Sequence, residues 1–314
     1  MKRTSAKISC LRTEARNSAA ARLDTSSPLE IARIINAEDA RVAPAVRRAL
    51  PRIASAIELI AGALERGGRL IYVGAGTSGR IAALDAAECP PTFNTDPRMV
   101  QFVMAGGAKA LGAAVEANED SRALGRRDMA AKKPTKSDVV VGIAASGRTP
   151  YTIAAVEYAR RCGAKTVAVT CNRSSALGKA ADLSIVVEVG PEVVAGSSRM
   201  KAGTAQKMVL NILSTGAMAR LGYVYGNLMV NVHLKNRKLV QRGIAILENA
   251  AEVDEDQARR TLRQAGNSVS VALVMLRAGV GRQAAERCLR SAKGHVRKAI
   301  ACALGHRTNG HRTK

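Results

Sequence analysis

The chain has 314 residues, enough for about two domains of roughly 150 residues each. Such a length buries a large core and needs no disulfide or structural metal to hold it. Hydrophobic residues make up 47% and charged residues 24%, a composition typical of a globular protein and not of a disordered one. No apolar run reaches the roughly 18 residues of a membrane span, and the basic N-terminus lacks a secretory apolar segment. We therefore expect a soluble cytoplasmic protein with no membrane partner.

The charge is strongly basic, with 49 Lys and Arg against 25 Asp and Glu and a formal net charge of +24. An excess of this size points to nucleic acid or to an anionic substrate. Single-strand binding usually adds aromatic stacking platforms, but the chain has only five Tyr, two Phe and no Trp. We interpret most of the excess as basic side chains on exposed helices. This argues against nucleic acid as the main partner and leaves an anionic substrate open.

The cysteines and histidines do not predict a metal site. No C-x-x-C pair occurs, and the four histidines do not cluster with the six cysteines in a zinc-like spacing. Free thiols are the default expectation in a reducing cytosol. Only Cys89 lies inside a motif of functional interest.

The first part of the chain predicts an irregular arm followed by two helices. Residues 1–27 are polar and rich in Ser, Thr and Arg. Ser27 followed by Pro28 is typical of a helix start. Helical patterns then cover Leu29–Ala37 and Val42–Glu65, and the second ends at a Gly-Gly pair.

Five short apolar runs follow, most of them separated by helix-length segments. Near-continuous apolar strands alternating with helices indicate a parallel sheet covered on both faces. We expect a five-stranded, doubly wound α/β domain, after which a long helical pattern resumes at Ser198–Leu221. The runs are Arg69–Gly74, Met99–Met104, Asp138–Gly142, Lys165–Thr170 and Leu183–Glu188.

The tail carries an internal repeat with a period of 27 residues, in which Ala258–Leu273 aligns with Ala285–Ile300. Each copy predicts a helix, a glycine turn and a second helix. The predicted organisation is an arm at 1–27, the α/β domain with its N-terminal helices at 28–240, a small helical bundle at 241–305 and a frayed tail at 306–314.

Two strand ends share one design: a strand, small residues, Ser-Gly-Arg and a helix. Ligands of open parallel sheets bind at the carboxyl ends of the strands, where the next helix presents unpaired N–H groups to an anion. Hydroxyl groups in these loops can donate to phosphate oxygens. We therefore predict a phosphate site formed by Thr77, Ser78, Ser146 and Thr149.

The ligand predicted from these loops is a phosphosugar and not a nucleotide. Gly74–Gly79 fits G-x-G-x-x-G, but the acidic residue that a Rossmann fold places after the next strand is missing, and no Walker loop occurs. A third polar block, Glu192–Lys207, joins the last strand to a long helix. Its hydroxyls, with Arg199 and Lys201, would suit the hydroxyls and the charge of a sugar phosphate.

Two acidic motifs could supply proton transfer beside such a ligand. In the first, Glu88 precedes Pro90 and Pro91, which should end the helix begun near Ser78. In the second, Glu116 and Glu119 are three residues apart and would share a helix face. Composition alone favours solvated surface positions for both motifs, whereas carboxylates flanking a phosphosugar could move protons on and off carbon and oxygen.

The loops and acids together resemble the bacterial N-acetylmuramic acid 6-phosphate etherases, which have the sugar isomerase (SIS) fold. The resemblance covers about residues 13 to 300, and the helical tail resembles the UBA-like C-terminal domain of that family. Long blocks such as Gly142–Tyr151 make it specific. The other matching stretches are Thr13–Asn17, Ile34–Asp39, Leu70–Arg80, Asp85–Thr92, Glu116–Ser121, Asp138–Tyr151, Gly196–Lys207, Asn227–Val230 and Asn236–Leu239.

The resemblance implies cleavage of the ether between D-lactate and C3 of N-acetylmuramic acid 6-phosphate, in the recycling of cell-wall sugars. It gives Glu119 the role of base at C2 and Glu88 that of the acid that protonates the departing lactate oxygen. Burial against the Pro90-Pro91 turn would raise the pKa of Glu88 and keep it protonated. Many members have Ser before the catalytic acid, where this chain has Ala87.

The remaining implications concern binding and assembly. Phosphate contacts carry over to Ser78, Ser146 and Thr149, with Thr77, Gly147 and Arg148 nearby, and sugar contacts to Ser197 and Ser198. No metal or redox cofactor is implied. The resemblance does imply a homodimer with its sites near the subunit interface.

Two other classes share the fold and stay open. A phosphosugar-sensing regulator such as the glucokinase regulatory protein binds without catalysis, but that class has a second complete SIS domain, for which 314 residues leave no room. A phosphosugar isomerase would share the proton abstraction at C2 but needs no acid for a leaving group at C3.

Overall fold

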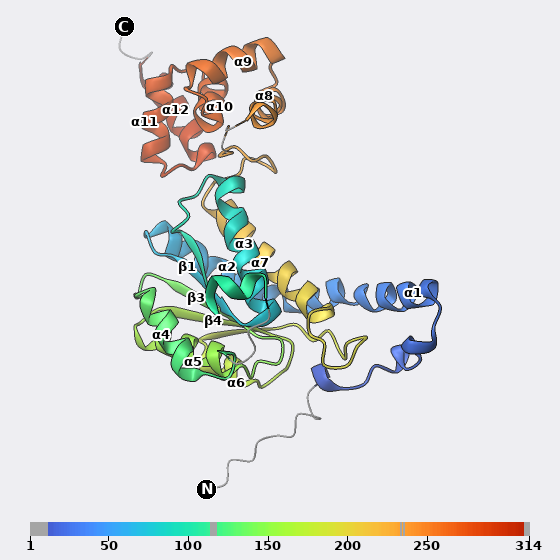
Figure 1. Ribbon diagram of the computed structural model, residues 1–314. Coiled ribbons are helices and arrows are strands. Elements are labelled where there is room, and N and C mark those ends of the chain that lie inside the picture. The colour runs from blue at the N-terminus through green and yellow to red at the C-terminus, as the bar shows by residue number, and fades with distance from the viewer. Residues whose placement is uncertain (1–11, 114–117, 233, 235, 311–314) are drawn as a thin grey trace. The chain divides into compact units, whose positions relative to one another are not determined.

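The computed structural model describes residues 12–113, 118–232, 234 and 236–310 (Figure 1). Its contacts divide the chain into two compact units. The first consists of Met1–Ala87 with Pro97–Ser214, and the second of Glu88–Asp96 with Thr215–Lys314.

The first unit is built on the predicted five-stranded parallel sheet, in the order β2-β1-β3-β4-β5. β1 lies between β2 and β3, so that Gly74 at its carboxyl end pairs with Met104 and with Ile143. Every residue of β1 and β3 is buried, as expected for strands covered on both faces. The strands are β1 (Leu70–Gly74), β2 (Val100–Met104), β3 (Val139–Ile143), β4 (Lys165–Thr170) and β5 (Leu183–Val186).

Helices cover both faces of the sheet, which confirms the doubly wound α/β prediction. Ile71 and Val73 share a core cluster with Tyr151 and Val156 of α5, whereas Tyr72 points to the other face and reaches α3. In Figure 1, α4, α5 and α6 lie on one side of the strands, and α2, α3 and α7 on the other. These helices are α2 (Val42–Glu65), α3 (Gly76–Phe93), α4 (Arg122–Ala131), α5 (Pro150–Arg161), α6 (Ala176–Ala180) and α7 (Lys201–Arg220).

Residues 12–27, the described part of the predicted arm, contain short helices in place of the irregular chain that was expected. Three short 3-10 helices occupy Arg12–Glu14, Ser18–Ala20 and Leu23–Thr25. α1 (Pro28–Asp39) then begins at the predicted proline, where Ser27 and Glu30 form a capping box.

Helix α3 does not stop before the two prolines, so that part of the prediction is wrong. It continues through Pro90 and Pro91 to Phe93. Each proline removes one N–H from the ladder, but both lie in the last turn, where few bonds remain to be made. Asn94 closes the helix by donating its N–H to the carbonyl of Pro90 at 2.9 Å, with a left-handed φ of 54°.

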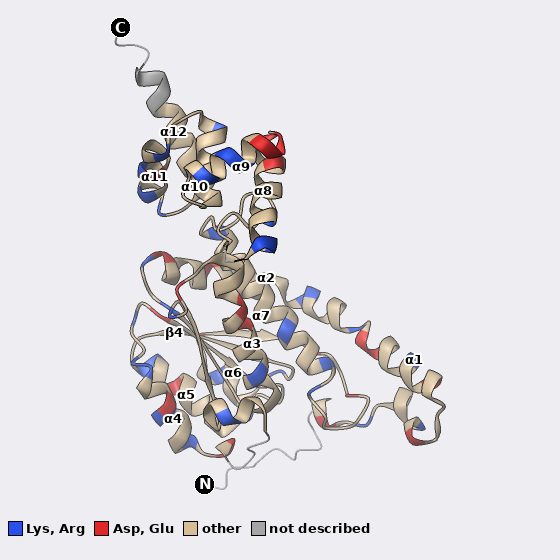
Figure 2. Cartoon of the chain, turned by 45° about the horizontal axis from the view of Figure 1, so that its top comes forward, with Lys and Arg blue, Asp and Glu red and all other residues tan. Residues whose placement is uncertain are grey.

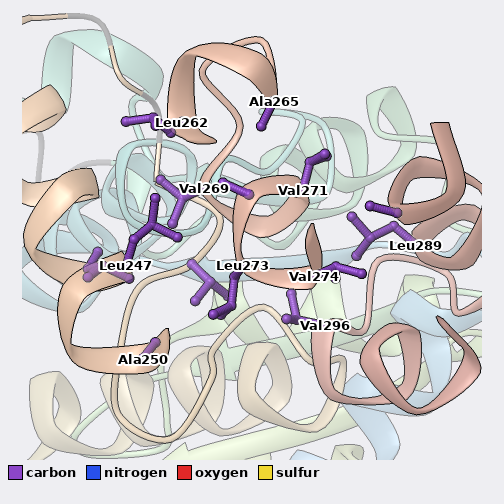
Figure 3. Packing of buried hydrophobic residues seen from close by; sticks show 14 of the residues in the cluster. Leu247, Ala250, Leu262, Ala265, Val269, Val271, Leu273, Val274, Leu289 and Val296 are labelled. Carbon is purple, nitrogen blue, oxygen red and sulfur yellow. The ribbon is translucent and has the colours of Figure 1, made fainter. Parts of the chain in front are cut away.

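The second unit contains the predicted repeat. Aligned pairs such as Leu262 and Leu289, or Val269 and Val296, are buried in one apolar cluster (Figure 3). Each copy is therefore a helix, a turn and a second helix that packs on its neighbours. The helices are α8 (Arg237–Ala251), α9 (Glu255–Gln264), α10 (Val269–Ala278), α11 (Arg282–Ser291) and α12 (Val296–Gly310).

Basic side chains occur on the helices of both units (Figure 2). This distribution matches the interpretation of the net charge of +24 as a property of exposed helices. Over the described residues, no helix combines the length and the apolar character that a membrane crossing requires.

A buried ion pair joins β1 and β3 at their amino ends, opposite the ends that carry the loops. Asp138 is 2% exposed and accepts hydrogen bonds from Arg69 Nε at 3.0 Å and Arg69 Nη2 at 2.8 Å. The N–H of Thr135 adds a third bond at 2.8 Å. Burial alone would raise the pKa of Asp138, but the bonds from Arg69 and Thr135 outweigh it and lower that pKa.

We predict that Asp138→Asn destabilises the first unit by about 3 kcal/mol, since it leaves Arg69 with an incomplete partner. A lowered folded-state pKa contributes stability above the unfolded value of about 3.9, which is lost as the pH falls through the folded value. Urea midpoints measured at pH 7 and in the acid range should therefore converge for the variant and the wild type. The exposed Asp24→Asn change is the control, and an equal gap at both pH values would contradict the prediction.

Candidate functional site

A cavity of about 360 Å³ lies at the carboxyl ends of the central strands of the first unit. This volume suits a small ligand. The lining residues come from the loops after β1, β2 and β3, from the N-terminal segment, from the turn before α4 and from the segment before α7. They are Thr13, Glu14, Ala75, Gly76, Thr77, Ser78, Arg80, Met104, Ala105, Ala110, Glu119, Ala144, Ala145, Ser146, Thr149 and Ser198.

The two similar loops meet in this cavity, as predicted from the sequence. Thr77 and Ser78 lie in the first turn of α3, and Ser146 and Thr149 precede α5. Thr149 is the N-cap residue of α5 but makes no side-chain capping bond. Ser146 accepts the N–H of Arg148 at 3.2 Å, so its own proton remains available to a ligand. Two helix starts, each with the positive end of its dipole and hydroxyl side chains turned to one cavity, form an anion-binding arrangement.

Ser78 is held by a residue that the sequence did not single out. Its hydroxyl donates to Oε1 of Gln206 on α7 at 3.0 Å, while the buried Nε2 of Gln206 has no partner among the described residues. A half-turn of the carboxamide would let Nε2 donate to Ser78 instead and would release the hydroxyl proton toward the cavity. We expect this orientation when an anion is bound, because the Ser78 hydroxyl can then accept from Nε2 and donate to the anion.

Glu119 is the predicted base that lies in the cavity. It occupies a turn before α4, and not the helix face expected for it. Its backbone carbonyl accepts the N–H of Tyr151 at 3.0 Å. A Cβ added at Gly76, which has a φ of +52°, would lie 2.9 Å from Oε1 of Glu119. The carboxylate therefore rests against the start of α3, while Glu116 lies outside the described residues.

Arg80 adds a cation to the lining and fixes the loop after β2. Its Nε donates to the carbonyl of Leu111 at 3.2 Å and its Nη2 to that of Ala113 at 2.8 Å. The Ser-Gly-Arg pattern contained this residue, but no role was predicted for it.

The N-terminal segment reaches the cavity through Thr13 and Glu14, which sequence reasoning missed as site residues. Thr13 is 2% exposed and accepts a hydrogen bond from Asn172 at 3.2 Å. The only sequence signal was the motif Thr13-Glu14-x-x-Asn17, because the surrounding residues have the composition of a loop.

Five of the other predicted contacts lie outside the lining, namely Gly147, Arg148, Ser197, Arg199 and Lys201. Gly147 has a φ of +67°, and a Cβ there would approach that of Ser175 to 2.3 Å, so its role is close packing. Lys201, which was expected to suit the ligand's charge, is 1% exposed and forms an ion pair with Glu38. Its ammonium group is therefore paired within the protein and does not face the ligand cavity.

Glu88 is not among the cavity-lining residues, and it belongs to the second unit. The expectation that it is buried against the proline turn is wrong for this structure, because its side chain is exposed on α3. The helix continues through the prolines, so no turn folds back over the carboxylate. Cys89 beside it is buried.

Asp85 is a buried acid on the same helix, one turn before Glu88. It accepts hydrogen bonds from Tyr72 at 2.8 Å, Asn211 at 2.8 Å and Ser214 at 3.1 Å. Burial raises the pKa of Asp85, and these bonds offset part of that effect. The cluster ties α3 to β1 and α7, so Asp85 has a structural role.

The arrangement can bind a small anion and place one carboxylate beside it. No cluster of three or more His, Cys, Asp or Glu suited to a metal ion occurs within the residues that the structure describes. The chemistry that these side chains can supply themselves is proton transfer by a carboxylate next to a ligand held by hydroxyls and backbone N–H groups.

Comparison with known proteins gives consistent matches. Residues 52–160 match the family model of the glucokinase regulatory protein N-terminal SIS domain, and residues 123–215 match that of the SIS domain. N-acetylmuramic acid 6-phosphate etherase 1 of Bacillus licheniformis is 47% identical, over 94% of this chain and 97% of that protein. The etherase of Symbiobacterium thermophilum is 57% identical, over 85% and 89%, and that of Streptomyces coelicolor is 50% identical, over 95% and 96%.

We predict that Gln206→Glu weakens binding of inorganic phosphate and of hexose 6-phosphates by about 10-fold or more. The change keeps the shape of the side chain, but a carboxylate accepts the Ser78 proton permanently and adds a negative charge. Gln206→Leu should weaken binding less, since Ser78 then keeps its proton for the ligand. Calorimetric titration measures both effects, and Gln264→Glu on the exposed face of α9 is the control. Unchanged affinity in Gln206→Glu would contradict the role assigned to this residue.

Proposed function

Since the chain belongs to the N-acetylmuramic acid 6-phosphate etherase family, we propose that it cleaves the lactyl ether of N-acetylmuramic acid 6-phosphate. The products are N-acetylglucosamine 6-phosphate and D-lactate, from the recycling of cell-wall sugars. The observation that carries this proposal is the meeting of two hydroxyl-bearing helix starts and Glu119 in one cavity.

The reaction we propose is an elimination followed by hydration. Opening of the sugar ring gives a C1 aldehyde, which acidifies the proton on C2. Glu119 removes this proton, the bond between C3 and the lactate oxygen breaks, and a C2–C3 double bond forms. Water then adds at C3 and a proton returns to C2. One base and one acid are sufficient for these steps.

The phosphate anchors the substrate so that C2 faces Glu119. Ser78, Ser146 and Thr149 would donate to the phosphate, with Thr77 beside them and the N–H groups of α3 and α5 adding positive potential. Ser198, which lines the same cavity, would contact the sugar. Gly147, Arg148 and Ser197 would act on the ligand only through the loops they shape.

Glu88 is the proposed acid for the leaving lactate oxygen, on the strength of its motif in the family. Its exposed side chain on α3 is free of the close packing that surrounds Asp85. We propose further that the enzyme is a cytoplasmic homodimer with its sites near the subunit interface.

A second candidate function is phosphosugar sensing without catalysis. The match of residues 52–160 to the regulatory-protein SIS domain favours it. The etherase relatives match almost the whole chain, however, including the segment before and the helices after the sheet. A sensor would bind the phosphosugar and release no lactate.

We predict that wild type releases D-lactate from N-acetylmuramic acid 6-phosphate and that Glu119→Ala reduces this by at least about 10³-fold, with no entry of solvent deuterium at C2. Glu88→Ala should still exchange deuterium but release lactate slowly, because only the leaving-group step lacks its acid. Lactate is measured enzymatically and deuterium by NMR in the same samples.

Glu58→Ala on α2 is the control for removal of an acid elsewhere. A folded wild type that binds the sugar phosphate but releases no lactate would contradict the etherase proposal and favour the sensor. Formation of an isomer without lactate would favour an isomerase.

We also predict that Gly76→Ala reduces lactate release by about 100-fold while the fold is retained. The added methyl group lies 2.9 Å from the position of Glu119 Oε1 and pushes the base aside, and misplacement of about 1 Å has an effect of this size. The positive φ adds a backbone cost of about 1 kcal/mol. Gly67→Ala has a positive φ with no neighbour within 4 Å of the added atom, and so controls for that cost. Equal activities of the two variants would overturn the prediction.

A further inference from the structure

The cavity contains a second carboxylate, Glu14, for which the proposed mechanism has no use. Glu14 is half-buried and lines the same cavity as Glu119. A Cβ added at Gly196 would lie 3.0 Å from its Oε2, so the carboxylate rests against the loop before α7. Among the residues that the structure describes, Glu14 has no hydrogen-bond or ion-pair partner. A carboxylate left without a protein partner in a ligand cavity is available to a ligand.

The backbone that carries Glu14 is fixed on both sides. Thr13 is bonded to Asn172, and Asn17 donates through Nδ2 to Glu38 at 2.8 Å and to the carbonyl of Pro191 at 3.2 Å. Glu14 is therefore presented by an anchored turn.

The anchor for Asn17 is itself a buried ion pair. Glu38 is 2% exposed and Lys201 is 1% exposed, and the two side chains bond to each other. Burial alone would raise the pKa of Glu38, but the bonds from Lys201 and Asn17 outweigh it and lower that pKa. Glu192 accepts the N–H groups of Lys201 and Ala202 at 3.0 and 2.9 Å, which fixes the start of α7 in the same place.

The charge of Glu14 restricts what it can bind. A carboxylate repels both the phosphate and the lactate carboxylate of the proposed substrate, because like charges in a cavity of reduced dielectric interact strongly. It accepts hydrogen bonds well from neutral O–H and N–H donors. The phosphate already has its own donors at the starts of α3 and α5. The neutral donors of the ligand are the sugar hydroxyls and the acetamido N–H.

We propose that Glu14 is a specificity-determining residue of this cavity, which accepts hydrogen bonds from the hydroxyl or acetamido N–H donors of the phosphosugar. The inference deepens the proposed function and rests on it for the identity of the sugar. It assigns to the anchored turn Thr13–Asn17 the recognition of the sugar, and to the loops after β1 and β3 the recognition of the phosphate.

The test compares two ligands with Glu14→Ala, using N-acetylglucosamine 6-phosphate and inorganic phosphate in calorimetric titrations. Affinity for the sugar phosphate should fall by about 10- to 100-fold, the effect expected for hydrogen bonds to a charged group. Affinity for inorganic phosphate should stay equal or rise, because a repelling charge has been removed. Glu14→Gln keeps one acceptor oxygen and should lie between the wild type and Glu14→Ala for the sugar phosphate. Asp24→Ala, an exposed acid of the same segment, is the matched control.

The opposite signs for the two ligands separate recognition from a structural role. Loss of affinity for both ligands in Glu14→Ala would mean that Glu14 only supports the cavity wall, and unchanged affinity for the sugar phosphate would mean that it does not touch the sugar. Either result overturns the proposal. A wild type that binds N-acetylglucosamine 6-phosphate but releases no lactate from N-acetylmuramic acid 6-phosphate would contradict the etherase function. The role of Glu14 in sugar binding would still stand.

Steady-state lactate release adds a readout for the positioning residue Asn17. Asn17→Ala frees the turn from Glu38 and Pro191, so KM should rise several-fold while kcat changes less, since the base is Glu119. Asn17→Gln, which keeps the carboxamide, should restore part of the loss. An effect of Asn17→Ala confined to kcat would contradict positioning through Glu14.

Discussion

The site depends on one feature of the sheet, the parallel pairing of β1 with β3. Because Gly74 lies opposite Ile143, the chain leaves both strands at the same level and starts α3 and α5 side by side. Each helix start contributes hydroxyl side chains and about half a positive charge from its dipole. The short side chains of the two loops keep this space open. A single helix start occurs in many sites of different function, whereas two that share one cavity with Glu119 support the proposed phosphosugar site.

Local sequence signals were sufficient to predict the sheet and the meeting of the two Ser-Gly-Arg loops at its edge. These signals determine the structure only of residues close to them in the chain. They are the apolar runs, the two Ser-Gly-Arg sequences and the helix start at Ser27 and Pro28. What the sequence did not predict depends on partners far away in the chain. Lys201 pairs with Glu38 across 163 positions, and Ser78 bonds to Gln206 across 128. No local pattern distinguishes a lysine that meets a phosphate from one that neutralises a buried glutamate.

The double proline after Glu88 shows a different limit. Proline is a strong local signal, and it correctly marks the region where α3 ends. The rule against proline in helices concerns interior positions, where a lost bond and a clash disrupt later turns. Near the end of a helix that is anchored elsewhere, the same residues are tolerated. Asp85, held by Tyr72, Asn211 and Ser214, provides such an anchor one turn before Glu88.

The lining of the cavity carries few charges for a protein with a net charge of +24. The described lining contains one cation, Arg80, and two carboxylates, Glu14 and Glu119. Additional Lys or Arg side chains close to the phosphate would form ion pairs with these carboxylates and hold them away from the sugar. Hydroxyls and helix N–H groups bind phosphate without doing so, because their dipoles are fixed by the fold. In the proposed function, neutral donors therefore hold the phosphate, and the two carboxylates remain available to the sugar.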